Sequence, residues 1–236
     1  MKNVFIILSS IILSVCFTAC EEELEIWDSA TYEYSGRWHF KAMSENGQIL
    51  KEYGSHTIQT YNSADDVSDE LWIYDVNNVF AAKEDSEGER TGNIGGIKIK
   101  AQLEGDYSNF YSVDNSEEGA GLNASGFPVP GIAPGEADEN VPAEDDVNVI
   151  PGFFNKGTVL EGKILKGAGT SKSGSQVDSI YLRLKLFAGE IVYNSVYDAE
   201  NESYVWDSGE FSYYAQPDSV VIISGTRYTG FEEDEY

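Results

Sequence analysis

Alternation of apolar and polar residues with a period of two constrains the fold of this chain more than any other feature. The alternation is clean in three segments, residues 36–43, 96–104 and 179–187. Their apolar members are Trp38, Phe40, Ala42, Ile97, Ile99, Ala101, Leu103, Ile180, Leu182, Leu184 and Leu186. Because successive side chains of a strand point to opposite faces, each segment predicts a β-strand with one buried face. Helical periodicity is scarce, so the sequence predicts an all-β fold.

Turn signals separate these strands and indicate where the others lie. Residues 44–47 (Ser-Glu-Asn-Gly) predict a hairpin turn, since Asn-Gly adopts positive φ at little cost. Further strands are expected near residues 49–61, 70–76, 157–165, 203–214 and 218–228. The total is about eight strands, all compatible with antiparallel neighbours, and closure into a barrel would remove their exposed edges. We therefore predict a single antiparallel, roughly eight-stranded β-barrel domain over residues 36–231.

Residues 105–156 interrupt this rhythm and predict a long acidic loop insertion rich in proline and glycine. The segment holds five of the six prolines. Its acidic cluster comprises Glu136, Asp138, Glu139, Glu144, Asp145 and Asp146. Such an insertion is usually a lid, a binding loop or a flexible excursion. Asp138, Glu139, Asp145 and Asp146 could bind calcium. The spacing of a dedicated calcium loop is absent, so we favour a solvated acidic surface and expect no metal site.

The balance of charged and apolar residues excludes some classes of partner. The chain has 41 acidic and 15 basic residues, which gives a formal net charge of −26 at pH 7. Such a chain repels the phosphates of nucleic acids and anionic lipid headgroups, so we expect no nucleic acid partner. The hydrophobic content of 41% and aromatic content of 13% are too high for a disordered chain. The charge is therefore expected on the outside of a genuine core.

The N-terminal residues have the anatomy of a lipoprotein signal peptide. A lysine precedes an apolar stretch at residues 4–15, which is too short to span a bilayer as a helix. Residues 17–20 (Phe-Thr-Ala-Cys) resemble a lipobox, in which a signal peptidase cuts before a cysteine that is then acylated, although phenylalanine stands where leucine is typical. We expect residues 1–19 to be removed and Cys20 to be the lipid anchor. An ordinary signal peptide cut nearby is the alternative.

An acidic run follows Cys20 directly, because residues 21–25 read Glu-Glu-Glu-Leu-Glu. Acidic runs in this place resemble the surface-export signal of Bacteroidetes lipoproteins. The resemblance implies an outer-membrane lipoprotein that faces the cell exterior and is tethered through residues 20–35, with the membrane as a partner through the lipid anchor. A solvated spacer on a periplasm-facing lipoprotein is the alternative. Residues 232–236 are again acidic and are expected to form a tail.

Two short motifs at the ends of the expected barrel are similar to the signature of lipocalins and their calycin relatives. These motifs are residues 36–38 (Gly-Arg-Trp) and residues 225–227 (Gly-Thr-Arg). The resemblance implies that Trp38 plugs the closed end of a lipocalin-like barrel and that Arg227 stacks across it as part of the barrel floor. A guanidinium over a tryptophan face contributes about 0.5–2 kcal/mol.

A longer set of matches resembles the Bacteroidetes lipoproteins grouped as lipid-binding putative hydrolases. The matching segments are residues 34–38, 61–65, 70–73 and the closing run at 224–234. They cover both ends of the chain. The resemblance implies lipid binding, whereas the residues themselves give little support for a hydrolase. The histidines are only His39 and His56, and no Gly-x-Ser-x-Gly motif occurs, so we predict no catalytic residue and no cofactor.

A glycine-rich stretch at residues 167–174 resembles a phosphate-binding loop but lacks its Gly-Lys-Ser/Thr ending. A hairpin loop is the better interpretation.

Two functional hypotheses remain open. The first is that the barrel binds an apolar small molecule or lipid through inward side chains, which are Phe40, Ile97, Ile99, Leu103, Leu182, Leu184 and Leu186. Side chains alone could equally fill an eight-stranded barrel. The second is a non-enzymatic accessory subunit that contacts protein or glycan in an outer-membrane assembly. Its candidate contacts are the aromatic residues Tyr193, Tyr197, Tyr204, Trp206, Tyr213 and Tyr214.

Overall fold

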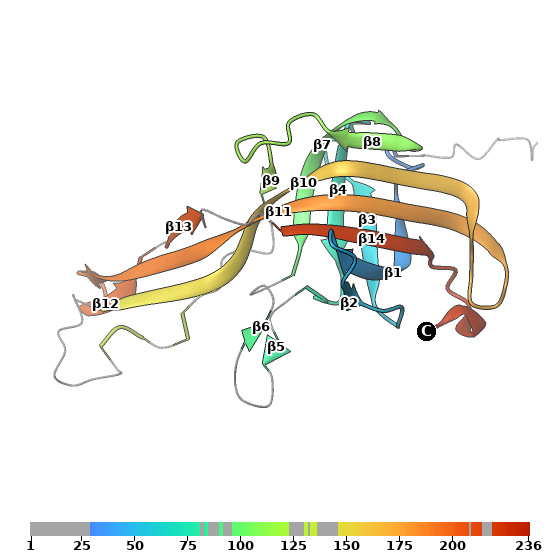
Figure 1. Cartoon of the computed structure of the whole chain (residues 1–236). Helices are drawn as coiled ribbons and strands as arrows, with labels where there is room; N and C mark the ends of the chain where they lie inside the picture. Colours follow the sequence, from blue (N-terminus) through green and yellow to red (C-terminus); the bar gives the residue numbers. More distant parts are fainter. Residues whose placement is uncertain are drawn as a thin grey trace, which may run out of the picture.

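The computed structural model is all-β (Figure 1), and no α-helix occurs in the part of the chain that it describes. The described residues are 29–80, 83–84, 90–91, 96–122, 130–131, 133–135, 146–207, 209–213 and 219–236. The strands are β1 (Gly36–Ser44), β2 (Ile49–Lys51), β3 (Thr57–Asn62), β4 (Glu70–Asp75), β5 (Lys83–Glu84), β6 (Arg90–Thr91), β7 (Lys98–Asp106), β8 (Asn109–Ser112), β9 (Gly121–Leu122), β10 (Val147–Thr170), β11 (Gln176–Asp198), β12 (Ser203–Trp206), β13 (Glu210–Tyr213) and β14 (Ser219–Arg227). A 3₁₀ turn, η2 (Glu232–Asp234), precedes the C-terminus.

Eight of these strands form a closed ring. Their order is β1-β3-β4-β7-β8-β10-β11-β14, with β14 pairing back onto β1, and every pairing is antiparallel. The seam between β8 and β10 is the narrowest, with the bridge Gly162↔Phe110. Closure leaves the ring without free edges. The prediction of an antiparallel, eight-stranded, all-β domain is confirmed.

The segment 105–156, which was predicted to be a loop, contains strands, so this prediction is wrong in part. The whole of β8 lies within it, and β10 begins at Val147. A tight turn folds β8 back onto β7, because the Asp106 side chain accepts hydrogen bonds from the backbone N–H groups of Ser108 (2.8 Å) and Asn109 (3.2 Å). Most of the acidic cluster, at residues 136–145, lies outside the described residues.

Aliphatic and aromatic side chains fill the ring closely. Two glycines of β10 show how close the packing is. A Cβ atom on Gly157 would meet Ile99 Cδ1 at 2.8 Å and Leu186 Cδ2 at 3.0 Å, and one on Gly162 would meet the Phe110 ring at 2.1 Å. These positions therefore require glycine because large side chains occupy the interior opposite them.

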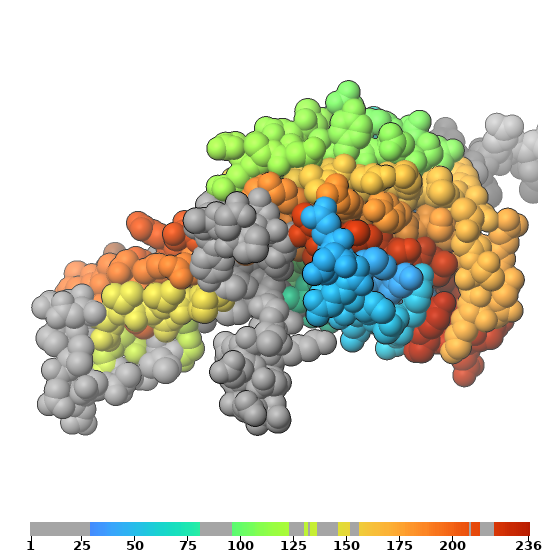
Figure 2. All heavy atoms as spheres, in the orientation of Figure 1, coloured from blue at the N-terminus to red at the C-terminus, as the bar shows by residue number. Residues whose placement is uncertain are grey.

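The β10–β11 hairpin is longer than the ring and projects from it. We call the projecting part the arm: residues 147–155 of β10 and 188–198 of β11, together with β12 and β13, which pair with β11. Figures 1 and 2 show the arm extending from one end of the ring, and the C-terminus lying near the opposite end. The arm has a small core of its own, formed by Ile191 and Tyr193 with Ile150, Trp206 and Phe211 packed against it.

The C-terminal residues are packed against the ring rather than free. Asp234 of η2 is only 5% exposed. Its carboxylate accepts hydrogen bonds from the backbone N–H of Ser173 (2.8 Å) and from Thr229 Oγ1 (2.7 Å). These hydrogen bonds hold the pKa of Asp234 well below its usual range. The glycine-rich stretch 167–174 thus contains a hairpin turn between β10 and β11, as expected, and this turn binds a carboxylate of its own chain.

Candidate functional site

The interior of the ring brings together the inward positions that the alternation predicts. Those residues are Phe40, Ile97, Ile99, Leu103, Leu182, Leu184 and Leu186, and all belong to one buried cluster. Leu103 is the most exposed of them, at 7%. The cluster also contains residues that the prediction did not name, among them Ile58, Ile73, Phe110, Ile164 and Ile223. The predicted ligand-binding positions therefore line one apolar interior, much of which they occupy themselves.

Trp38 and Arg227 lie together at one end of this interior, which we call the closed end. The guanidinium carbon of Arg227 is 4.4 Å from the centroid of the Trp38 ring. Arg227 Nη1 donates a hydrogen bond to the Ser35 carbonyl (2.9 Å), and Trp38 Nε1 donates one to Thr60 Oγ1 (3.0 Å). A Cβ atom on Gly36 would lie 2.5 Å from Arg227 Nη1, so the glycine allows this close approach.

The segment before β1 covers the closed end. The backbone turns twice between Ser29 and Ser35, through hydrogen bonds such as that from Tyr34 N–H to the Thr31 carbonyl (2.9 Å). Tyr34 packs against the core cluster, with its ring edge-on to Phe110 at 5.4 Å between centroids. The chain therefore enters the ring at the end where Trp38 and Arg227 lie.

The opposite end, which we call the arm end, is covered by the residues that follow β4. Val79 and Phe80 pack against the core cluster, and the Phe80 ring stacks on Phe40 at 6.0 Å between centroids. The backbone N–H of Phe80 donates a hydrogen bond to the buried carboxylate of Asp75 (3.0 Å). Phe80 is half-buried, so it covers part of the apolar cluster while the rest of its side chain faces the surface.

A row of valines continues the inner face of the ring along the arm. On β11 the inward residues Leu184 and Leu186 are an even number of positions from Val192 and Val196, and no bulge interrupts β11 between them. All four side chains therefore lie on the same face of the strand. Val192 pairs with Val149 of β10, and Val196 pairs with Val205 of β12. We call this surface the valine face; its members are Val147, Val149, Val192, Val196 and Val205.

Four of the five side chains of the valine face are exposed to solvent, and Val192 is half-buried. The exposed fractions are 57% for Val147, 48% for Val149, 44% for Val196 and 37% for Val205. The arm buries its other face, since Ile191 and Tyr193 have odd numbers whereas the inward residues of the ring have even numbers. This surface was not predicted from the sequence, although Leu182, Leu186 and Val196 all have even numbers on one continuous strand.

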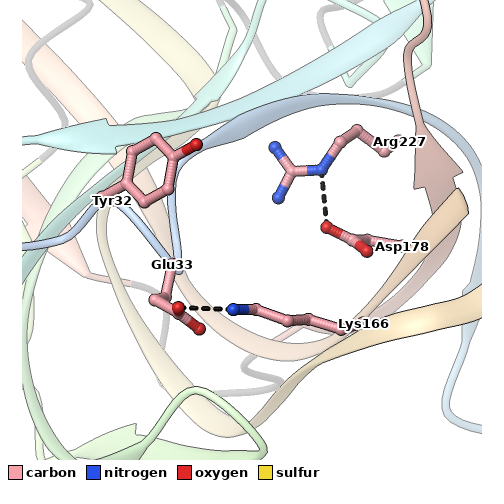
Figure 3. Close-up of a pocket in the computed structure, with 5 residues that line it drawn as sticks. All are labelled: Tyr32, Glu33, Lys166, Asp178 and Arg227. Carbon is pink, nitrogen blue, oxygen red and sulfur yellow. Dashed lines mark hydrogen bonds and ion pairs between the residues drawn. The ribbon is translucent and has the colours of Figure 1, made fainter. Parts of the chain in front are cut away.

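A polar pocket lies at the closed end, outside the Trp38–Arg227 contact (Figure 3). Its volume is about 310 Å³, and it is lined by Tyr32, Glu33, Lys166, Asp178 and Arg227. Lys166 forms an ion pair with Glu33, and Arg227 Nε donates a hydrogen bond to Asp178 Oδ2 at 2.9 Å. The hydrogen bond to Glu33 raises the pKa of Lys166, which keeps this ammonium charged at neutral pH.

Both histidines are engaged by structural contacts. His39 lies on the outer face of β1, as alternation predicts, yet it is only 2% exposed because Tyr228 and Tyr236 pack against its ring at 5.2 and 5.0 Å. Its Nδ1 lies 3.2 Å from a backbone carbonyl oxygen. His56 Nε2 lies 2.9 Å from the carbonyl oxygen of Phe40. Within the described residues, no group of three or more His, Cys, Asp or Glu side chains is arranged to hold a metal ion.

The comparison with protein families agrees with a lipid-binding function. Residues 23–232 match the model of a family described as lipid-binding putative hydrolase. The chain belongs to this family. No curated protein matches it. Membership in this family, which the sequence motifs indicated, is confirmed, whereas the Bacteroidetes origin and the lipoprotein character stay predictions.

The match to the lipid-binding putative hydrolase family covers β1 through β14, and therefore both the ring and the arm. Cys20 lies before the matched segment and outside the described residues, so its acylation stays a prediction. The structure describes no helix of sufficient length and hydropathy to cross a membrane among the residues it places.

Proposed function

We propose that this protein is a lipid-binding lipoprotein whose acyl-chain site lies at the arm end of the ring and extends along the valine face. The valine face carries this proposal, because it exposes aliphatic side chains on the continuation of the inner face of the ring, where Glu190 and Asn194 of β11 lie between them. Several exposed aliphatic side chains on one face of a domain commonly mark a binding site. The family description, which names lipid binding, supports the same assignment.

The packing of the ring determines where such a ligand fits. Side chains already fill the interior around Gly157 and Gly162, so little of an acyl chain can lie there unless side chains move. Along β11, by contrast, the distance from Leu186 to Val196 is about 33 Å at ~3.3 Å per residue. This row, in which Glu190 and Asn194 alternate with the apolar residues, is long enough to hold an extended acyl chain.

The energetics favour a ligand with a long aliphatic chain. Removal of apolar surface from water contributes about 25 cal/mol per Å². Covering the valine face therefore contributes on the order of several kcal/mol before the cost of association is subtracted. Phe80 would act as a movable cover, since its displacement opens the apolar cluster beside Phe40 to the end of the same chain.

We further propose that Cys20 anchors the protein to the outer membrane, with the domain facing the cell exterior. The described chain begins at residue 29 on the closed end of the ring, and the arm leaves from the other end (Figure 1). A tether at the closed end would therefore direct the arm away from the membrane. Mass spectrometry of the mature N-terminus tests the anchor: a diacylated Cys20 is expected, and an unmodified N-terminus cut elsewhere would contradict it.

The lipid-binding proposal is tested by mass spectrometry of an organic extract from the unacylated chain that begins at residue 21, followed by titration with a fatty-acid mixture. A near-stoichiometric acyl species is expected. The double variant Val149→Asp/Val196→Asp should weaken binding at least about tenfold, because charge on the valine face opposes an acyl chain. Val113→Asp is the matched control, since Val113 is 59% exposed and lies outside the arm. A blank extract that stays blank after titration would exclude the proposal.

A second candidate function is that of a non-enzymatic accessory subunit whose arm contacts a protein or glycan in an outer-membrane assembly. The observation in its favour is the pair Tyr197 and Tyr204, whose rings meet edge-on at 5.3 Å, with Tyr197 57% exposed. Exposed tyrosines beside polar residues are common in interfaces. A stoichiometric partner that is retained by the wild type and lost in Tyr197→Ala, together with unchanged lipid binding, would favour this function over the first.

A further inference from the structure

We propose that the polar pocket at the closed end is a second binding site, which takes a neutral polyhydroxylated ligand of about one sugar ring. The pocket is formed by Tyr32 and Glu33 of the segment before β1, Lys166 of β10, Asp178 of β11 and Arg227 of β14. Four separate parts of the chain thus meet around a space of about 310 Å³. This volume is at the lower limit for small-molecule pockets, which begin at about 300 Å³.

The pocket is distinct from the proposed lipid site. The Arg227 guanidinium lies over the Trp38 ring, and Trp38 is fully buried, so this contact separates the pocket from the apolar interior. The valine face and Phe80 are at the other end of the ring. Occupancy of one site therefore does not require occupancy of the other, and the two proposals can fail independently.

The charges of the pocket favour a neutral ligand. Two carboxylates and two cations line it, and they are joined in the pairs Glu33–Lys166 and Asp178–Arg227. A ligand with a net charge would have to compete with one of these pairs for its partner. Hydroxyl groups, in contrast, donate to carboxylates and accept from cations, so a polyol can bind without separating the pairs.

One polar atom of the pocket lacks a hydrogen bond. Glu33 Oε2 is buried and has no hydrogen-bond partner in the structure, whereas Oε1 of the same carboxylate is bound by Lys166. A buried acceptor without a partner is unfavourable, and 39% of the Glu33 side chain is exposed, so a rotation of its carboxylate would bring this oxygen within reach of a donor in the pocket. A ligand hydroxyl in the pocket would provide this donor.

Tyr32 provides the remaining feature of a sugar site. Its side chain is 61% exposed, and Figure 3 shows its ring at the edge of the pocket with the hydroxyl group directed toward the same space as the Arg227 guanidinium. An aromatic face with a polar tip offers apolar contact to the C–H groups of a sugar ring and a hydrogen bond to its hydroxyls. The pocket therefore combines an apolar face with charge-assisted hydrogen-bonding groups.

The test is saturation-transfer NMR on the full-length protein in a detergent that carries no sugar headgroup. The probes are methyl α-D-glucopyranoside, methyl β-D-galactopyranoside and methyl α-D-mannopyranoside, with glycine and inorganic phosphate as charged comparators. Saturation transfer to at least one glycoside is expected, with a dissociation constant in the millimolar range. Transfer to none of the glycosides, or to glycine or phosphate alone, would overturn the proposal.

Three variants locate the binding. Glu33→Ala and Tyr32→Ala should each weaken glycoside binding at least about fivefold, and Tyr32→Ala is expected to fold normally because the side chain is exposed. Glu161→Ala is the matched control, since Glu161 forms an ion pair with Lys163 on the same strand but does not line the pocket. Equal glycoside binding by all three variants would place the ligand elsewhere and overturn the proposal.

Discussion

The ring and the arm are built from the same two long strands, yet they are stabilised in different ways. In the ring, β10 and β11 have neighbours on both sides and cover one large cluster that includes Leu182 and Leu184. In the arm, the same strands cover only a small core around Ile191 and Tyr193. From the ring into the arm, β11 continues without a bulge, whereas the pairing of β10 shifts at Pro151/Phe153 and again at Phe154/Lys156. The change from a closed, densely packed sheet to a thinly supported ribbon therefore coincides with two irregularities in β10.

The difference arises from which face of β11 is buried. The even-numbered side chains are buried up to Leu186, and the odd-numbered ones are buried from Phe187 to Tyr193. The inner face of the ring thereby becomes the exposed valine face of the arm. Elements with few buried contacts open more easily than the core and commonly carry binding functions. We infer that the ring provides stability and that the arm presents a surface.

The difference in stability between the ring and the arm is tested most directly by removing one buried aliphatic side chain from each region. Leu182→Ala in the ring is expected to lower the free energy of unfolding by about 2–5 kcal/mol, through lost burial and the cavity that remains. Ile191→Ala in the arm, where Ile191 is equally buried, should lower it much less, because the arm can open locally. Urea unfolding measures the first effect, and hydrogen exchange of the arm amides measures the second. Equal losses of global stability would show that the arm and the ring unfold as one unit.

Arg227 provides the next test, because it stabilises the closed end of the ring. Arg227→Gln removes the contact with Trp38 and the hydrogen bond to Asp178, and is expected to cost about 1–3 kcal/mol. Arg183→Gln is the control, since Arg183 forms an ion pair with the exposed Glu45. Exposed pairs contribute about 0–1 kcal/mol. Equal effects of the two variants in thermal unfolding would mean that the closed end does not depend on Arg227.

The third test concerns Asp234, which fixes the C-terminal turn to the closed end. Its pKa is depressed in the folded state, so its contribution is fully present above the ordinary carboxyl pKa of 3.8 and is lost as the pH falls toward the folded-state value. Asp234→Asn is therefore expected to be less stable than wild type at pH 7, and the difference should shrink as the pH falls below about 4.

Urea unfolding at a series of pH values measures this difference. Glu233→Gln, an exposed position in the same turn, is the control and should show no such convergence. A difference between wild type and Asp234→Asn that stays constant down to pH 3 would contradict the proposed role of the carboxylate.

The parts of this structure that depend on local periodicity could be predicted from the sequence. Leu182, Leu184 and Leu186 alternate with polar residues, so both their strand and their burial follow from the pattern. β8 was not predicted as a strand, because it is short and only two of its residues, Phe110 and Ser112, are buried. The contact of Trp38 with Arg227 was expected only through the resemblance to lipocalins, since nothing local connects the two residues.

The polar pocket and the covering of His39 could not be predicted, because both depend on contacts between distant segments. Glu33 and Lys166 are separated by more than a hundred residues, and their pairing follows from the closure of the ring. Alternation correctly assigns His39 to the outer face, but its burial is due to Tyr228 and Tyr236, which lie near the C-terminus. The valine face is an intermediate case, because its parity is visible in the sequence while its exposure depends on where the ring ends.

Substitutions on the valine face are expected to have the smallest effect on stability, and they test whether the arm contributes to binding rather than to the fold. Val149→Ser and Val196→Ser on the valine face should each change the free energy of unfolding by no more than about 0.5 kcal/mol, because both side chains are already nearly half exposed. The same substitutions are expected to weaken acyl-chain binding, since they remove apolar surface from the proposed site. Urea unfolding and fatty-acid titration of the same preparations separate the two effects. A loss of stability comparable to that of Leu182→Ala would show that the valine face supports the fold, and the division between a stabilising ring and a binding arm would not hold.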